Sequence, residues 1–198
     1  MKQIISLAFL ALLSSTCVAQ KVQKKRFSTG FNLGVNHANL LASEIAHGSV
    51  ENGIGFRLGL VSDFAFTKRF SIQPKAELSF NNIKFRSGTQ EMVVNPIDLE
   101  FISHFKIRLK PCPQSFFFVL GPNVKIPLDS DKVNTLPTRQ DVALDLGIGY
   151  DVTLGKVRVS PELRYSIGLV NITESSSVSD LRFHNVSLLL NFTGRPRL

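Results

Sequence analysis

The feature that most constrains this chain is an alternation of apolar and polar residues that recurs from residue 27 almost to the end. In GYDVTLGKVRVSPELRY, residues 149–165, nearly every second residue is apolar, and the residues between them include Asp151, Arg158 and Glu162. A period of two is typical of a β-strand with two different faces. The segments that show it are 27–36, 54–66, 70–81, 96–109, 116–126, 141–154, 157–170 and 185–193. At 198 residues, the chain is therefore predicted to form one all-β domain of eight strands.

The connections between these segments alternate in length. The connections 67–69, 110–115 and 155–156 are short, whereas 37–53, 82–95, 127–140 and 171–184 are long. An up-and-down barrel in a membrane has short turns at one end and long loops at the other, and its strands need about 9–11 residues. This parity places both termini of the chain at the short-turn end of the barrel. Gly155-Lys156 is predicted to be a two-residue periplasmic hairpin with a type II′ turn.

Charge decides which face of the strands is inside. The apolar face is nearly free of charge, whereas the polar face carries both signs in nearly equal number. Charges on a soluble sandwich need no partners, but the interior of an eight-stranded barrel is only wide enough for side chains, and an unpaired ion there costs several kcal/mol. We therefore predict an eight-stranded antiparallel transmembrane β-barrel with an ion-paired interior. The charged residues predicted to line it are Arg57, Asp63, Lys75, Glu77, Asp98, Glu100, Lys106, Arg108, Lys125, Asp141, Asp145, Asp151, Arg158, Glu162 and Arg164.

Small residues and prolines refine this prediction. Glycines 30, 34, 55, 59, 147 and 149 share the polar face, which suits a crowded interior, and Phe117 and Val119 join that face in the weakest segment. Pro74 and Pro161 lie on the apolar face, where a missing N–H predicts a bulge or break in the hydrogen-bonded ladder. The side chains of the opening stretch predicted to face lipid are Tyr150, Val152, Leu154, Val157, Val159, Leu163 and Tyr165.

The first residues resemble an export signal. Lys2 precedes the apolar stretch 4–13 and the small-residue stretch 14–19, so cleavage is predicted after Ala19. Lipidation of Cys17 is the disfavoured alternative, because Ser14 stands three residues before it where a leucine is expected. The predicted organisation is a signal peptide at 1–19, a basic segment at 20–26, a barrel at 27–193 and a tail at 194–198. An exported chain that forms a transmembrane β-barrel is expected in the outer membrane.

No motif predicts catalysis, and we expect no catalytic residue, cofactor site or metal site. There is no phosphate-binding glycine loop and no zinc spacing, and Cys112, the only cysteine left after cleavage, lies in a turn. His104 is predicted to be a hydrogen-bonded interior residue beside Glu100 and Arg108, and His184 has no evident partner. A barrel enzyme would need a nucleophile and a base together at one rim. The residues that could form such a catalytic set are His37, Ser43, Glu44, His47 and Ser49. The favoured interpretation of this segment is a solvated loop without a catalytic role.

The net charge of +8 does not predict nucleic-acid binding, because many basic residues lie at the ends of the chain and no RNA-binding motif accompanies them. Positive ends better suit anionic lipid headgroups. The expected partners are thus the lipid bilayer and other proteins, with no small-molecule substrate. The basic residues near the ends are Lys2, Lys21, Lys24, Lys25, Arg26, Arg182, Arg195 and Arg197.

Two strands resemble a known family. The segments IQPKAEL, residues 72–78, and VSPELRY, residues 159–165, are similar to the Q-P-E-L strand signature of outer-membrane barrels common in Bacteroidetes. DLGIGYD, residues 145–151, followed by SPELRYSIGLVN, residues 160–171, resembles the late strands of the PorT family. The resemblance implies an outer-membrane barrel that assists type IX protein secretion and gliding, and it supplies no catalytic residue. The chain departs from the family at KPCPQ, residues 110–114, where a polar turn is usual.

Two other functions stay open at this point. The interior charges could tune a narrow pore, which makes a small channel or a barrel enzyme the alternative to a secretion component. A soluble lipocalin-like barrel of the periplasm is a third possibility.

Overall fold

The computed structural model describes residues 26–44, 49–51, 53–81, 83–87, 90–94, 97–112, 114–128, 140–170 and 179–194. The predicted signal peptide, most of the basic segment and residues 195–198 lie outside this part. Within the described residues, no helix is long and apolar enough to cross a membrane.

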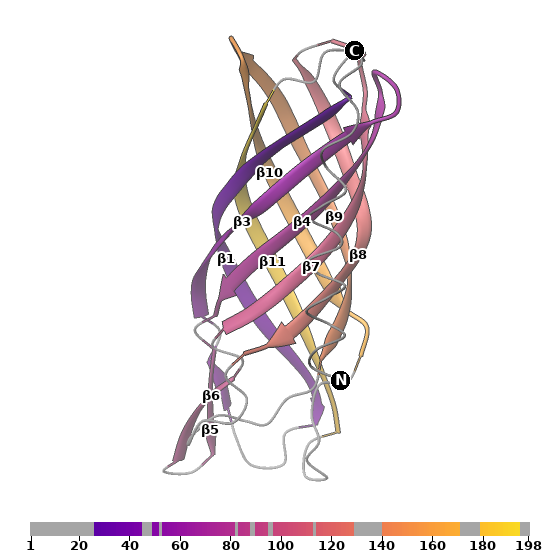
Figure 1. The fold of residues 1–198 in the computed structure, drawn as a ribbon. Helices are drawn as coiled ribbons and strands as arrows, with labels where there is room; N and C mark the ends of the chain where they lie inside the picture. The colour runs from indigo at the N-terminus through magenta and orange to yellow at the C-terminus, as the bar shows by residue number, and fades with distance from the viewer. Residues whose placement is uncertain are drawn as a thin grey trace, which may run out of the picture.

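Eight antiparallel strands close into the predicted barrel (Figure 1). Each strand pairs with its neighbours along the chain, and β1 closes the barrel by pairing with β11, from Gly30 opposite Thr193 to Glu44 opposite Ser179. Around the barrel the order is β1-β11-β10-β9-β8-β7-β4-β3. The strands are β1 (Phe27–Glu44), β3 (Gly53–Ala65), β4 (Phe70–Phe80), β7 (Ile97–Arg108), β8 (Ser115–Pro127), β9 (Asp141–Leu154), β10 (Val157–Gly168) and β11 (Ser179–Gly194).

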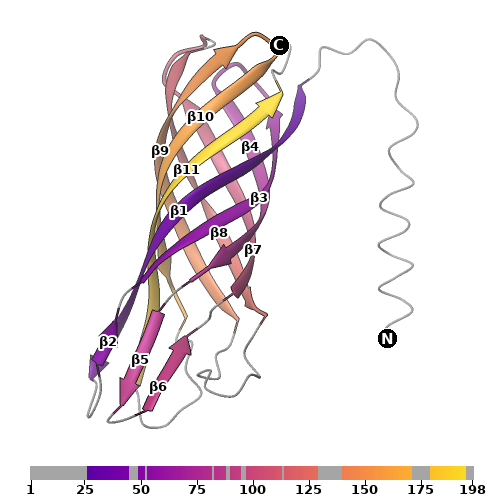
Figure 2. The ribbon, with the colours of Figure 1, turned by 90° about the vertical axis from the view of Figure 1, so that its left-hand side faces the viewer.

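At the long-loop end the strands continue beyond the predicted segments. The β1–β11 ladder runs on to residues 44 and 179, although the sequence predicted loops at 37–53 and 171–184. The predicted loop 82–95 contains a hairpin, β5 (Ile83–Ser87) and β6 (Gln90–Val94), which forms a small sheet with β2 (Ser49–Glu51) in the order β2-β5-β6 (Figure 2). The loop prediction was wrong here because it relied on segments long enough to span a bilayer, about 9–11 residues, whereas β2, β5 and β6 have only three to five residues.

The short turns are held by local hydrogen bonds. Thr67 Oγ1 accepts hydrogen bonds from the N–H groups of Arg69 (3.2 Å) and Phe70 (2.9 Å). The Lys110 N–H donates to Ser115 Oγ at 2.9 Å. Gly155 and Lys156 form the predicted two-residue hairpin, and Gly155 has φ 61°, the positive value that I′ and II′ turns require at the first central position. These turns lie at the end of the barrel opposite the β2-β5-β6 sheet (Figure 1).

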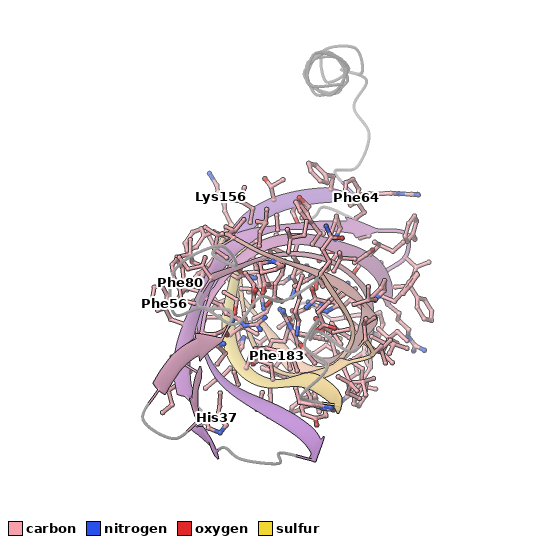
Figure 3. All side chains as sticks on the ribbon, turned by 90° about the horizontal axis from the view of Figure 1, so that it is seen from below. His37, Phe56, Phe64, Phe80, Lys156 and Phe183 are labelled. Carbon is pink, nitrogen blue, oxygen red and sulfur yellow. The ribbon has the colours of Figure 1, made fainter. Side chains whose placement is uncertain are left out.

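The outer surface of the barrel is apolar, as predicted. Leu154, Leu163 and Tyr165 are 63%, 50% and 41% exposed, and Tyr150, Val152 and Val159 are partly exposed on the same face. Aromatic rings pack against each other across strands, as in the Phe56–Phe80 pair with centroids 4.2 Å apart. Seen along the barrel, Phe56, Phe64 and Phe80 point away from it (Figure 3). Such a surface buries itself only in lipid or against protein.

The prolines interrupt the ladder without shifting it. Between β9 and β10 the pairing stops after Val159 opposite Val152 and resumes in the same register at Glu162 opposite Gly149, so Pro161 causes a break and no bulge. Pro74 leaves the same gap between β3 and β4, and Pro122, which the sequence analysis overlooked, leaves one between β7 and β8. Each proline keeps the pairing on its other side, because only one neighbour loses the N–H.

Candidate functional site

The lumen contains the charged residues that the sequence assigned to it. All fifteen are 7% exposed or less, and they comprise seven cations and eight anions. Nitrogen and oxygen atoms crowd the interior when the barrel is viewed along its length, whereas carbon dominates the outside (Figure 3). We describe these residues as three layers, which are the central layer, the short-turn layer and the long-loop layer.

The central layer crosses the barrel. Arg164 on β10 donates two hydrogen bonds to Glu77 on β4, at 2.9 and 3.0 Å, and its Nε donates to Glu162 at 3.0 Å. Lys75 on β4 donates to both oxygens of Glu162, at 3.0 and 2.9 Å. The strands β4 and β10 stand opposite each other, with three strands between them on either side. These contacts therefore close the lumen from wall to wall.

Further groups fill the rest of the central layer. Arg57 forms an ion pair with Glu100, with Nη2 and Oε1 3.0 Å apart, and Asn123 donates to the same carboxylate at 2.7 Å. His104 is buried in the lumen as predicted, but it pairs with Asp145 on β9, with Nε2 and Oδ2 3.1 Å apart, and not with its neighbours along β7. The partner comes from another strand, which spacing along one segment could not identify.

The short-turn layer is equally dense. Arg108 donates to Asp63 and to Asp151, each at 2.8 Å, and Lys106 donates to Asp151 at 2.7 Å. Arg158 donates to Asp63 at 3.1 Å. Each carboxylate here serves at least two cations, and together they join β3, β7, β9 and β10.

Aromatic and aliphatic side chains plug the lumen where glycines leave room. Phe117 is fully buried under the ammonium group of Lys106, which lies 3.6 Å from the ring centroid. Directly opposite on β9 is Gly149, where an added Cβ would lie 2.3 Å from Phe117 Cζ. Val119 faces Gly147 in the same way, at 2.7 Å. The glycines and the two apolar residues that the sequence placed on the polar face are therefore complementary in size.

The ion pair of the long-loop layer is longer than the main ion pairs of the other two layers. Lys125, the one cation among the described residues that we assign to this layer, lies 3.6 Å from Asp141 and 4.6 Å from the centroid of the buried Phe183 ring. Asp98 accepts a hydrogen bond from Asn81 at 2.8 Å, and Asn36 donates to Asn81 at 2.7 Å. Within the described residues, Oδ1 of Asp98 has no hydrogen-bond partner, and the same holds for Glu100 Oε1 in the central layer and Asp63 Oδ1 in the short-turn layer.

Of the residues that could form a catalytic set, only His37 has a described side chain, and that side chain does not lie in the lumen. His37 is exposed on the outer face of β1, Ser43 and Glu44 are in β1, and Ser49 is in β2. His47 lies outside the described residues, so the complete set is not tested. In the described part of the chain, no three histidine, cysteine or acidic residues are grouped as metal ligands, and Cys112 is a free, exposed thiol.

His184 has a partner that the sequence analysis missed. Tyr165 Oη and His184 Nδ1 are 2.9 Å apart on the outer face. In the register of β10 and β11, His184 faces Ile167, which places it diagonally across from Tyr165. Extending the last strand before residue 185 would have predicted this pair.

A closed antiparallel barrel with a lipid-compatible exterior and an ion-paired lumen is a membrane-spanning β-barrel. A family model described as "Outer membrane protein beta-barrel domain" matches residues 18–174, and the chain belongs to that family. It is therefore a protein of the outer membrane. No curated protein matches the sequence.

The structure is similar to solved barrels at low sequence identity. Neisserial surface protein A is 9% identical with a TM-score of 0.50, and the match covers 87% of this chain and 97% of that protein. OprG from Pseudomonas aeruginosa is 11% identical with a TM-score of 0.49, over 85% and 91% of the two chains. Ail of Yersinia pestis is 10% identical with a TM-score of 0.45, over 84% and 97%. Identities this low concern the fold alone.

Proposed function

We propose that this outer-membrane barrel does not conduct and has no enzymatic activity, and that it acts through protein partners outside the bilayer as an accessory or assembly component of type IX secretion and gliding. The observation that carries the first part is the contact of Lys75 and Arg164 with acidic residues on the opposite wall, at 2.9–3.0 Å. A permeant ion would have to break charge-assisted hydrogen bonds in a buried site, where such bonds are strong.

The strands beyond the apolar band support a role outside the bilayer. The ladder of β1 and β11 continues past His37 opposite Val186 to Glu44 opposite Ser179. The β2-β5-β6 sheet lies at the same end (Figures 1 and 2). A barrel that served only as a membrane plug would need no such extension, and the outer strands of a small sheet offer backbone groups to an added strand.

The secretion role rests on the resemblance of residues 72–78 and 145–171 to the PorT family of Bacteroidetes. We include in the proposal export by a signal peptide that is cleaved after Ala19. The fold is compatible with this role, because an accessory factor in the outer membrane needs a stable anchor and an accessible surface and needs no catalytic site.

Deleting the gene in the source bacterium and measuring secreted protein and gliding tests the role. We expect secretion and gliding to fail and the intact gene to restore them. A second complementing variant, with residues 83–94 replaced by a short glycine-serine turn, removes β5 and β6 and keeps β4 and β7. It should fold, as judged by heat-modifiable gel mobility, and should not restore secretion.

Normal secretion and gliding in the deletion strain would contradict the secretion role. Full rescue by the variant that lacks β5 and β6 would remove the small sheet from the proposal. Lipid hydrolysis or acyl transfer by the purified protein would contradict the absence of enzymatic activity.

A further inference from the structure

The two ends of the barrel differ in the charge outside the lumen. Every charged residue exposed at the short-turn end of the described chain is basic. At the other end, the sequence of the described strands contains both signs of charge, which are the basic residues Lys84, Arg86 and Arg182 and the acidic residues Glu44, Glu51, Glu91 and Asp180. We define the basic rim as Arg26, Lys68, Arg69, Lys110 and Lys156, all of them exposed.

The basic rim lies at the edge of the apolar band. Lys68 and Arg69 stand between Phe66 and Phe70, which are 59% and 51% exposed. Lys156 stands between Leu154 and Val157, at 63% and 45%, in the Gly155 hairpin. With about 3.3 Å per strand residue, each charge lies within about 7 Å of a lipid-facing side chain, which is headgroup depth. Long basic side chains reach from such positions to the phosphates.

Aromatic pairs mark the same edge. The rings of Phe27 and Phe64 lie 4.5 Å apart, and those of Phe116 and Tyr150 lie 4.8 Å apart. Tyrosine is enriched where a membrane protein crosses from hydrocarbon to headgroups. The rim therefore lies where an outer-membrane barrel, whose short turns are periplasmic, meets its periplasmic leaflet.

We propose that the basic rim binds the phosphate headgroups of anionic phospholipids in the leaflet at the short-turn end of the barrel. Charge complementarity carries the proposal, because five cations surround this end without an exposed acid in the described residues to neutralise them. Basic residues beside a membrane attract anionic lipid, and salt weakens the attraction. The rim would hold the barrel at a fixed depth and surround it with a preferred lipid.

The test uses the full-length protein in phosphatidylcholine bilayers that contain a trace of spin-labelled phosphatidylglycerol or phosphatidylcholine. The relative association constant of the two labels is measured for three proteins. They are the wild type, the rim variant Lys68→Gln/Arg69→Gln/Lys156→Gln, and the control Lys84→Gln/Arg86→Gln/Arg182→Gln, which loses the same charge at the opposite end. Heat-modifiable gel mobility verifies that each protein is folded.

We expect the wild type and the control to prefer phosphatidylglycerol by roughly threefold or more, and the rim variant, which keeps Arg26 and Lys110, to lose most of this preference. Raising the salt to about 0.5 M should remove most of the wild-type preference without any substitution. The proposal is overturned if the wild type shows no preference, if the rim variant keeps it, or if the control loses as much. An absent preference would also mean that the rim serves another anion, such as an acidic periplasmic protein.

Discussion

The central layer and the long-loop layer of the lumen both pair buried charges, but the contacts in the central layer are shorter. In the central layer, Arg164 and Lys75 make hydrogen bonds of 2.9–3.0 Å to carboxylates, and these bonds join opposite walls. In the long-loop layer, Lys125 lies 3.6 Å from Asp141, which is longer than these hydrogen bonds. The difference indicates that short charge-assisted hydrogen bonds hold opposite walls together at the middle of the barrel, whereas the cation near the small sheet is held more loosely.

Removing the central cation should have the largest effect. Arg164→Leu leaves Glu77 and Glu162 buried without their shared partner, and breaking a buried ion pair costs about 3–5 kcal/mol. Urea unfolding in lipid vesicles measures the loss. A cost below about 1 kcal/mol would show that the central layer is not what holds the opposite walls together.

One chemical change made in both layers sharpens the comparison. Lys75→Gln removes a cation with two hydrogen bonds to Glu162, whereas Lys125→Gln removes one that lies 3.6 Å from its only acidic partner in the described residues. We expect Lys75→Gln to reduce the free energy of unfolding by about 2 kcal/mol more than Lys125→Gln. Equal losses would remove the distinction between the layers.

Disturbing the packing of Phe117 against Gly149 in the lumen should cost less stability than breaking the ion pairs. A Cβ at Gly149 meets Phe117 Cζ at 2.3 Å and the Pro161 carbonyl oxygen at 2.5 Å, so Gly149→Ala should cost about 1–2 kcal/mol. Adding Phe117→Leu should recover part of the loss, because the smaller side chain removes one of the two clashes. Strictly additive losses in a double-mutant cycle would contradict this direct contact.

The outer face provides the smallest expected effect. Tyr165→Phe removes the 2.9 Å hydrogen bond to His184 and keeps the ring, and such bonds in membranes contribute about 0.6 kcal/mol. The same unfolding assay measures it. A loss above about 2 kcal/mol would place a stabilising polar contact on the outer face, which the contrast between lumen and exterior does not predict.

Much of this architecture follows from the sequence, because lipid and lumen impose a period of two on every spanning strand. That period gave the number of strands, the side of the barrel for each of the fifteen charges, and the hairpin at Gly155. The pairing of Lys75 with Glu162 could not be predicted, because it depends on how the strands are staggered around the barrel. The same holds for His104 and Asp145.

The small sheet was missed for a different reason. Its strands have only three to five residues, which is too short to span a bilayer, so β2, β5 and β6 resemble loops in the sequence although Ile83 and Phe85 of β5 alternate with polar residues. The functional residues of a barrel without a catalytic motif have no sequence signal either. The basic rim could have been predicted from Lys68, Arg69 and Lys156, once the short turns were assigned to one end.

The most direct test of the account is the conductance of the purified barrel in a planar lipid bilayer. The wild type should pass no steady ionic current, because the contacts of Lys75 and Arg164 with the opposite walls close the lumen. A current should appear in the double variant Lys75→Ala/Arg164→Ala. Heat-modifiable gel mobility first verifies that this variant is folded. Stable, reproducible channel openings of the wild-type protein would contradict the closed lumen and would favour a small channel.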